Sequence, residues 1–148
     1  MLINLLLGLP IMVVCLLLQT ALLVVASRYY INHRDLVNNS SFWSSMRVVS
    51  SVMLLLVIGN LGQIAVWAWL FLFLEEFQQF DISFYHSAVN FGSLGYGDIV
   101  MSDEHKLLGA LEAINGVLMI GVSTAALMMA FQDSIKQTRN ASSRETPG

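Results

Sequence analysis

The sequence predicts an all-α membrane protein with three transmembrane helices and one shorter helix that enters the membrane without crossing it. Three apolar runs each reach the length of roughly 20 residues that a helix needs to cross a bilayer. The composition, with 56% hydrophobic and 11% charged residues and a mean hydropathy of +0.68, is typical of a membrane protein. The aromatic segment at residues 82–91 is too short to span and stands before a glycine-rich loop.

The composition also excludes several classes of function. The 7 lysines and arginines are scattered and are outnumbered by 10 acidic residues, so the chain lacks the basic patch of a nucleic-acid-binding protein. Cys15 is the only cysteine, which excludes an internal disulfide. The sequence holds no Cys/His cluster with metal-ligand spacing, no phosphate-binding glycine loop and no nucleophile motif. We therefore expect neither an enzyme nor a cofactor.

The first apolar run covers residues 2–26 and predicts an N-terminal transmembrane helix. Pro10 is expected to bend its first half, and Asn4 and Gln19 are its main polar interruptions. A cleaved signal peptide is the alternative, because residues 24–27 weakly resemble a processing site. The absence of positive charge before the run, together with its length, favours the spanning helix.

Residues 28–51 are polar and carry three arginines against a single acidic residue, Asp35. Short loops that are rich in lysine and arginine stay on the cytoplasmic side of a membrane. The segment therefore predicts a cytoplasmic connector between the first two transmembrane helices.

The second apolar run, residues 51–74, predicts the next transmembrane helix. Trp67 and Trp69 lie toward its far end, where indole rings favour the membrane interface. Asn60 and Gln63 lie near its middle, and at that depth we expect them to form hydrogen bonds between helices rather than to contact ions.

The segment from residue 75 to residue 106 is acidic, with Lys106 as its only lysine or arginine. Acidic residues at a pore mouth raise the local concentration of cations, although an extracellular loop that merely lacks positive charge has the same composition. Residues 82–91 predict a re-entrant helix, which Asp81 is expected to cap. The negative C-terminal end of this helix would favour a cation.

The loop that follows, residues 93–98 with the sequence Ser-Leu-Gly-Tyr-Gly-Asp, predicts an ion selectivity filter, and a plain extracellular turn is the alternative because glycine-rich tripeptides are common in turns. Two glycines around one tyrosine permit backbone angles that are closed to other residues, so consecutive carbonyl oxygens can face the same side. Four such strands around one axis would form stacked rings of oxygen. Non-helical backbone survives at membrane depth only where protein or water covers it, which here requires a closed ring of subunits.

At this point the chain resembles the potassium channel family, whose selectivity filter has the pattern T-V-G-Y-G-D. The resemblance covers about residues 84–131 and implies that backbone carbonyls replace the water shell of K⁺. The filter residues it implies are Ser93, Leu94, Gly95, Tyr96 and Gly97, with K⁺ held by the first four. Ser93 and Leu94 keep the hydroxyl and the apolar side chain of the family pattern. Gly92 stands where threonine is usual, which loosens the turn and predicts less strict selectivity.

The resemblance also implies residues that support the filter. Tyr85 stands at an aromatic bracing position and is expected to bond Asp98. Val89 occupies a position where some members carry a buried carboxylate, so inactivation that depends on that group is not predicted. Glu112 is a carboxylate inside a spanning helix, which by default marks a functional site or a buried partner. One hypothesis places it behind the filter, in the bracing role that Val89 cannot take, and the other places it near the outer interface. Its candidate partners are Asn90, Tyr85 and Ser87.

The third apolar run, residues 107–131, resembles the inner, pore-lining helix of the family. Gly116 corresponds to a gating hinge and Gly121 is a second candidate, because glycine weakens a helix by about 1 kcal/mol relative to alanine. Close helix packing at these small residues is the alternative. Helical spacing puts four residues on one stripe, which by resemblance lines the cavity and inner gate: Val117, Ile120, Thr124 and Met128. Packing of the same stripe inside a bundle is the alternative.

Together these observations predict a homotetramer, because one subunit supplies a quarter of a filter. The expected function is K⁺-selective conduction, with K⁺ as the transported ion. A non-selective cation channel and a non-conducting assembly or regulatory subunit are the alternatives. We expect an integral protein of the bacterial inner membrane, in contact with lipids, with the N-terminus outside and the C-terminus in the cytoplasm. The gating stimulus is not predicted, and a separate regulatory subunit is one option.

The expected domain boundaries follow from the same runs. They are 1–27 for the N-terminal transmembrane helix, 28–51 for the cytoplasmic connector, 52–131 for the pore domain and 132–148 for a cytoplasmic tail. The tail is expected to be disordered from Asn140 onward, because it is polar and has few apolar residues to bury.

Overall fold

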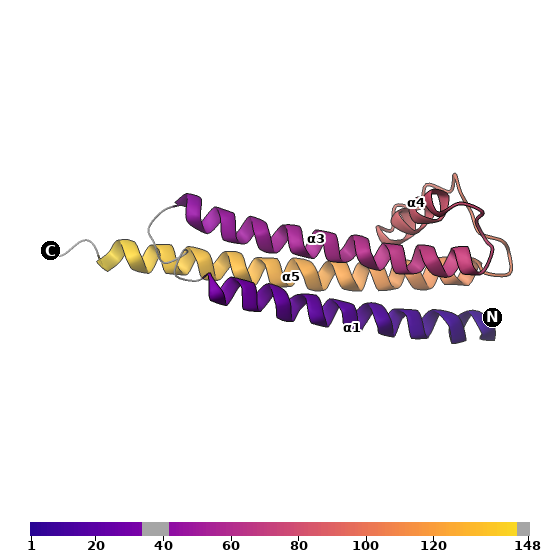
Figure 1. Ribbon diagram of the computed structural model, residues 1–148, viewed down its shortest axis with the longest axis horizontal. Helices are drawn as coiled ribbons and strands as arrows, with labels where there is room; N and C mark the ends of the chain where they lie inside the picture. The colour runs from indigo at the N-terminus through magenta and orange to yellow at the C-terminus, as the bar shows by residue number, and fades with distance from the viewer. Residues whose placement is uncertain (34–41, 145–148) are drawn as a thin grey trace. The chain divides into compact units, whose positions relative to one another are not determined.

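The computed structural model describes residues 1–33 and 42–144, and within them the chain is entirely helical apart from its loops. The helices are α1 (Leu2–Asn32), α3 (Phe42–Phe73), α4 (Phe80–Phe91) and α5 (Lys106–Arg144) (Figure 1). Three segments are long and apolar enough to cross a membrane: Leu2–Asn32, Met46–Phe73 and Lys106–Lys136. The predicted all-α fold, with three transmembrane helices and one shorter helix, is confirmed.

The long helices extend beyond the apolar runs that predicted them. α1 continues to Asn32 and α3 begins at Phe42, so both ends of the predicted connector are helical, while residues 34–41 lie outside the described part. α5 continues to Arg144, so the disorder expected from Asn140 is wrong as far as that residue; 145–148 lie outside the described part. Extending an existing helix adds one hydrogen bond per residue without a new nucleation cost, so a polar sequence can follow an apolar one in the same helix.

α4 begins two residues earlier than predicted. Its N-cap is Gln79, whose side chain makes no capping hydrogen bond, and Asp81 lies in the first turn. The expectation that Asp81 caps the helix is therefore wrong. The carboxylate still lies near the positive end of the helix dipole, where a negative charge is favourable.

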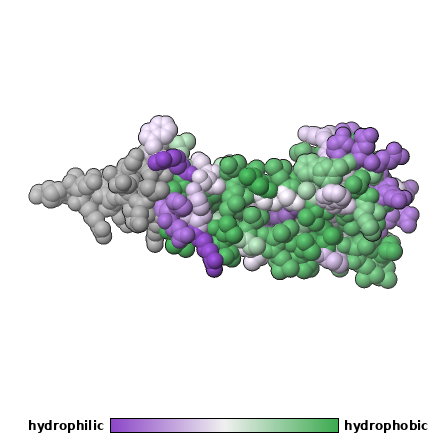
Figure 2. Space-filling model, in the orientation of Figure 1, coloured by the Kyte–Doolittle hydropathy of each residue, from purple (hydrophilic) through white to green (hydrophobic). Residues whose placement is uncertain are grey.

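The chain folds into two compact units. The first unit consists of Met1–Thr20 and Gly59–Gly121, and it includes α4 and the glycine-rich loop. The second unit consists of Ala21–Ile58 and Val122–Gly148. Figure 2 shows hydrophobic side chains over the helices and hydrophilic ones in separate groups, one of which lies around the loops next to α4.

The core of the first unit is aromatic. The ring of Phe71 lies 5.9 Å from that of Trp67, 6.5 Å from Phe77 and 5.7 Å from His86, measured between ring centroids. Cys15 of α1 is fully buried in the same cluster, so α1 is part of this core.

α1 also approaches its neighbours closely within the first unit. A methyl group at Gly8 would lie 2.5 Å from Leu111 Cδ1, which means that α1 and α5 are in close contact. Gln63 Nε2 donates to Gln19 Oε1 across 2.7 Å in a buried bond between α3 and α1. The predicted interhelical hydrogen bond of Gln63 is thus present, and polar side chains in an apolar environment gain most from such pairing.

The second unit has a smaller core. Ala26 of α1 packs with Val52 and Leu56 of α3. Tyr30 donates its hydroxyl to Asp133 Oδ2 across 3.1 Å, which joins α1 to α5 within this unit.

Candidate functional site

The glycine-rich loop leaves α4 through a tight C-terminal turn. Ser93 N–H donates to Asn90 O at 2.8 Å, and Leu94 N–H donates to Val89 O at 2.9 Å. This pair of bonds is the Schellman motif, in which one residue must adopt the left-handed conformation. Ser93 holds that position with φ 55°. The turn uses the N–H groups at the start of the loop to close the helix, and it leaves the loop carbonyls unused.

Beyond the turn, positive φ recurs at every second residue. After Ser93, the angle is 62° at Gly95 and 72° at Gly97, whereas Leu94 and Tyr96 do not have positive φ. Such alternation turns successive peptide groups so that their carbonyls can face one side. Among the described residues, no backbone N–H donates to a carbonyl of residues 93–97. We call residues 93–97 the strand, although they belong to no β-sheet. Their carbonyl oxygens thus have no backbone partners in the described residues, and oxygens of this kind are ligands for a cation.

The loop after this strand is held by side chains of α4. Tyr85 donates its hydroxyl to Asp98 Oδ2 across 2.7 Å, which is the predicted bond. His86 lies 3.0 Å from Ile99 O through Nδ1 and 2.8 Å from the Asn90 amide through Nε2. A carbonyl only accepts, so Nδ1 carries the proton and Nε2 accepts from Asn90. Burial lowers the pKa of His86 below its ordinary value of 6.5, in agreement with this neutral form.

The same loop is also held by the end of α3 and by α1. Glu76 accepts hydrogen bonds from Ser102 N–H at 2.8 Å, from the Ser102 hydroxyl and from His105 Nδ1. Burial opposes the ionisation of Glu76, but these bonds outweigh it and lower its pKa below 4.5. Asn4 Nδ2 donates to Glu104 O at 2.7 Å. Sequence reasoning missed these anchors, although a polar residue within an apolar run and a carboxylate just after one were visible signals.

Glu112 lies on the side of α5 that packs against α4. Its side chain is fully buried and interacts with Ser87 and Asn90, although no contact of its carboxylate oxygens in the described residues has the geometry of a full hydrogen bond. Tyr85, the third predicted partner, bonds Asp98 instead. Five further buried side-chain atoms of this unit have no hydrogen-bond partner in the described residues: Asn4 Oδ1, Gln63 Oε1, Trp67 Nε1, Ser87 Oγ and Asn115 Nδ2. Buried polar groups are normally hydrogen-bonded, so this cluster is a feature that packing alone does not explain.

The two candidate hinge glycines of α5 differ in their surroundings. A methyl group at Gly116 would lie 2.1 Å from the carbonyl oxygen of Phe91, so this glycine allows α5 to contact the backbone at the end of α4. A methyl group at Gly121 would meet nothing within 4 Å, and Gly121 is the last residue of the first unit. Both lie inside the continuous helix α5.

The predicted cavity stripe of α5 is exposed in the single chain. Val117 is 57% and Ile120 41% exposed, and Thr124 and Met128 are also exposed. Val117 and Ser93 line the same open hollow of about 310 Å³. One member of the stripe therefore lies next to the first residue of the candidate filter.

Comparison with protein families identifies a match over the pore region. Residues 54–133, more than half of the chain, match a family model described as an ion channel. The match includes α4, the glycine-rich loop and most of α5. Neither a curated protein nor a solved structure matches the chain at a significant level.

Proposed function

The chain belongs to the ion channel family, and we propose that it conducts K⁺ selectively through a pore built from four copies. The observation that carries the proposal is the strand at residues 93–97, with alternating φ and carbonyls that accept no backbone hydrogen bond. Carbonyl rings of this kind replace the hydration shell of K⁺ in potassium channels. In this proposal Ser93, Leu94, Gly95 and Tyr96 bind the ion, and Gly97 completes the strand.

The exposure of the loop supports assembly around an axis. Leu94 is 56% and Tyr96 65% exposed in the single chain. The protein is an integral membrane protein, and unpaired backbone at membrane depth requires protein or water around it. A closed ring of four copies supplies both, with water and ions on the axis and neighbouring subunits at the sides.

The electrostatics of the loop favour a cation. The C-terminal, negative end of α4 directly precedes the strand. The hydrogen bond from Tyr85 lowers the pKa of Asp98 below 3.8, so this carboxylate is ionised at neutral pH. Glu76 is ionised there as well, for the reason given above. We assign these residues to the outer mouth, with Tyr85 and Asp98 bracing the strand.

The hinge and the cavity lining of the proposed channel are assigned to residues of α5. The hydrogen of Gly116 faces the backbone of Phe91, so in this proposal the hinge is at Gly121, where a methyl group would have no neighbouring atom within 4 Å and which is the last residue of the first unit. The stripe from Val117 to Met128 lines the cavity on the inner side in this proposal. The arginines at the start of α3 and the end of α1 support a cytoplasmic location for that side, with the N-terminus outside, because short arginine-rich loops stay in the cytoplasm.

Reconstitution of the purified full chain tests the proposal. In planar bilayers with opposed K⁺ and Na⁺ gradients, we expect currents that reverse near the K⁺ equilibrium potential and that barium blocks. Reversal near zero would identify a non-selective cation channel, to which Gly92, Ser93 and Leu94 point as departures from the family pattern. The absence of any cation flux from a folded oligomer would reject conduction and favour an assembly role.

A further inference from the structure

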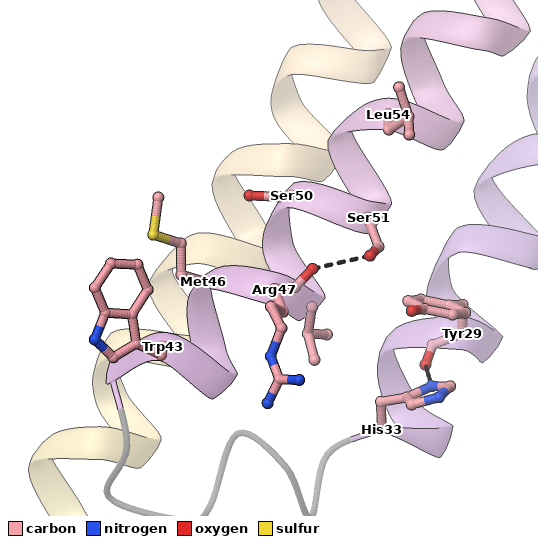
Figure 3. Close-up of a pocket in the computed structure, with 9 residues that line it drawn as sticks. Tyr29, His33, Trp43, Met46, Arg47, Ser50, Ser51 and Leu54 are labelled. Carbon is pink, nitrogen blue, oxygen red and sulfur yellow. Dashed lines mark hydrogen bonds between the residues drawn. The ribbon is translucent and has the colours of Figure 1, made fainter.

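A groove in the second unit has the composition of a phospholipid site. It has a volume of about 580 Å³ and lies between the last turns of α1 and the first turns of α3 (Figure 3). Its size is within the range of roughly 300–1,000 Å³ that is usual for small-molecule sites. The residues that define its character are Tyr29, His33, Trp43, Arg47, Ser50 and Leu54.

The groove has a polar part and an apolar part. Figure 3 shows the Arg47 guanidinium reaching toward the space between α3 and His33 at the end of α1. His33 Nδ1 donates to Tyr29 O at 2.9 Å, so Nε2 is left as an acceptor for a hydroxyl group of a ligand. Arg47 is exposed, and no carboxylate among the described residues pairs with it. Two turns along α3, Leu54 provides an apolar wall that is 60% exposed.

The groove lies where the two helices meet the membrane boundary. One candidate span ends at Asn32 and the next begins at Met46. Trp43 is 72% exposed just outside the second span, and Tyr29 lies near the end of the first. Aromatic rings of this kind favour the headgroup level of a bilayer.

We propose that this groove binds one anionic phospholipid, with the phosphate at Arg47, a headgroup hydroxyl at His33 Nε2 and an acyl chain along Leu54. A guanidinium offers a planar pair of donors that matches phosphate oxygens, and basic sites next to transmembrane helices hold anionic headgroups. The apolar wall and the indole favour a lipid over a free phosphate. The proposal does not depend on conduction, since it requires only that the helices lie in a membrane.

Native mass spectrometry of the full chain in detergent tests the site. The probes are phosphatidylglycerol and phosphatidylcholine with identical acyl chains. We expect tighter binding of phosphatidylglycerol, and about five-fold weaker binding after Arg47→Gln, because one arginine near a lipid surface contributes about 1 kcal/mol. The matched control is Arg28→Gln, which removes an exposed arginine of α1 that does not line the groove, and we expect it to change binding less than two-fold.

Further measurements distinguish binding of a whole lipid from binding of a free headgroup. Glycerol phosphate should compete only weakly, and Leu54→Asn should weaken phosphatidylglycerol without strengthening the competitor. Arg47→Lys, which keeps the charge and the helix, should lie between wild type and Arg47→Gln. Equal binding of the two lipids, equal effects of Arg28→Gln and Arg47→Gln, or glycerol phosphate binding as tightly as the lipid would each overturn the proposal.

Discussion

Two consecutive segments of the first unit are built in opposite ways. The strand at residues 93–97 has carbonyls that accept no backbone hydrogen bond in the described structure. The loop at 98–105 is held by side chains from three other elements, through Asn4 of α1, Glu76 after α3, and Tyr85 and His86 of α4. The strand is thus fixed by what stands before and after it, rather than by bonds of its own. A binding strand needs this division, because an oxygen used in a hydrogen bond is a poorer ligand for an ion.

The largest expected effect comes from the strand itself. Gly95 has φ 62°, and a methyl group there would meet nothing within 4 Å, so Gly95→Ala acts through backbone strain alone. We expect K⁺ flux to fall at least about 100-fold while the oligomer stays intact by size-exclusion chromatography with light scattering.

Gly62→Ala is the matched control for this substitution. Gly62 lies within α3 without positive φ and also has open space around it. Alanine should be tolerated there, with normal flux. Normal flux in Gly95→Ala would remove the strand from the conduction path.

The next effect concerns the contact that positions the start of the strand. Gly116→Ala places a methyl group 2.1 Å from Phe91 O, so α4 and α5 must separate. We expect a loss of stability of about 1–3 kcal/mol, measured as a lower thermal midpoint. Gly121→Ala should raise the midpoint, because alanine favours a helix by about 1 kcal/mol over glycine and has open space there, and it should alter open probability. If the two variants have equal midpoints, the contact has been assigned wrongly.

A smaller effect is expected from the anchored loop. Glu76→Gln removes the charge of the group that accepts hydrogen bonds from Ser102 and His105. Hydrogen bonds to a charged acceptor contribute about 1.5–3 kcal/mol, and the glutamine retains part of this because its amide oxygen still accepts. Faster hydrogen exchange at residues 98–105 should report the loosening. Glu75→Gln, at the exposed neighbouring position, should leave exchange at wild-type rates. Equal exchange in both variants would mean that the loop does not depend on Glu76.

Acid should loosen the same loop without any mutation. The pKa of His86 is lowered below 6.5 by burial, so its contribution is complete above that pH and is lost as the pH falls through the lowered value. The pKa values of Asp98 and Glu76 are also lowered, so their contributions are present above 3.8 and 4.5 and are lost at still lower pH. Exchange at 98–105, corrected for its intrinsic pH dependence, should therefore increase on acidification. An increase on raising the pH from neutral would contradict the assignment.

The smallest expected effect is that of Glu112→Gln. The amide keeps the shape of the side chain beside Ser87 and Asn90 and removes its acidity, so folding and selectivity should be preserved. We expect a change in open probability or in its pH dependence between mild acid and mild alkali. Asn115→Asp is a useful comparison, since it introduces a second carboxyl group into the same cluster. If open probability in Glu112→Gln matches wild type over this range, Glu112 has no role in gating.

The sequence predicted the anchored loop far less well than the strand. The spanning helices can be predicted from composition. The glycines at positions 95 and 97 indicate positive φ angles, because glycine adopts them without strain. The Tyr85–Asp98 bond was found because a family pattern pairs these positions. In contrast, Glu76 and Asn4 bond to groups that lie 26 and 100 positions away, and several of these are backbone atoms that every residue has. Such contacts depend on how the helices pack, and local sequence patterns do not predict this packing.

The role of Gly116 could not be predicted from the sequence either. Glycine within a helix fits both a hinge and a close contact, and only the position of Phe91 decides between them. Asp81 was expected to cap α4, but the helix already begins at Phe80. Its N-cap residue is Gln79, whose side chain makes no capping hydrogen bond. Helix ends are decided by small energies, so residue type alone does not fix them.

Anomalous scattering from thallium, a K⁺ analogue, tests the central claim most directly. Crystals of the purified oligomer grown with thallium should show a row of peaks on a four-fold axis, at the level of the carbonyls of residues 93–97. Peaks elsewhere, a different symmetry, or carbonyls turned away from the axis would contradict the account.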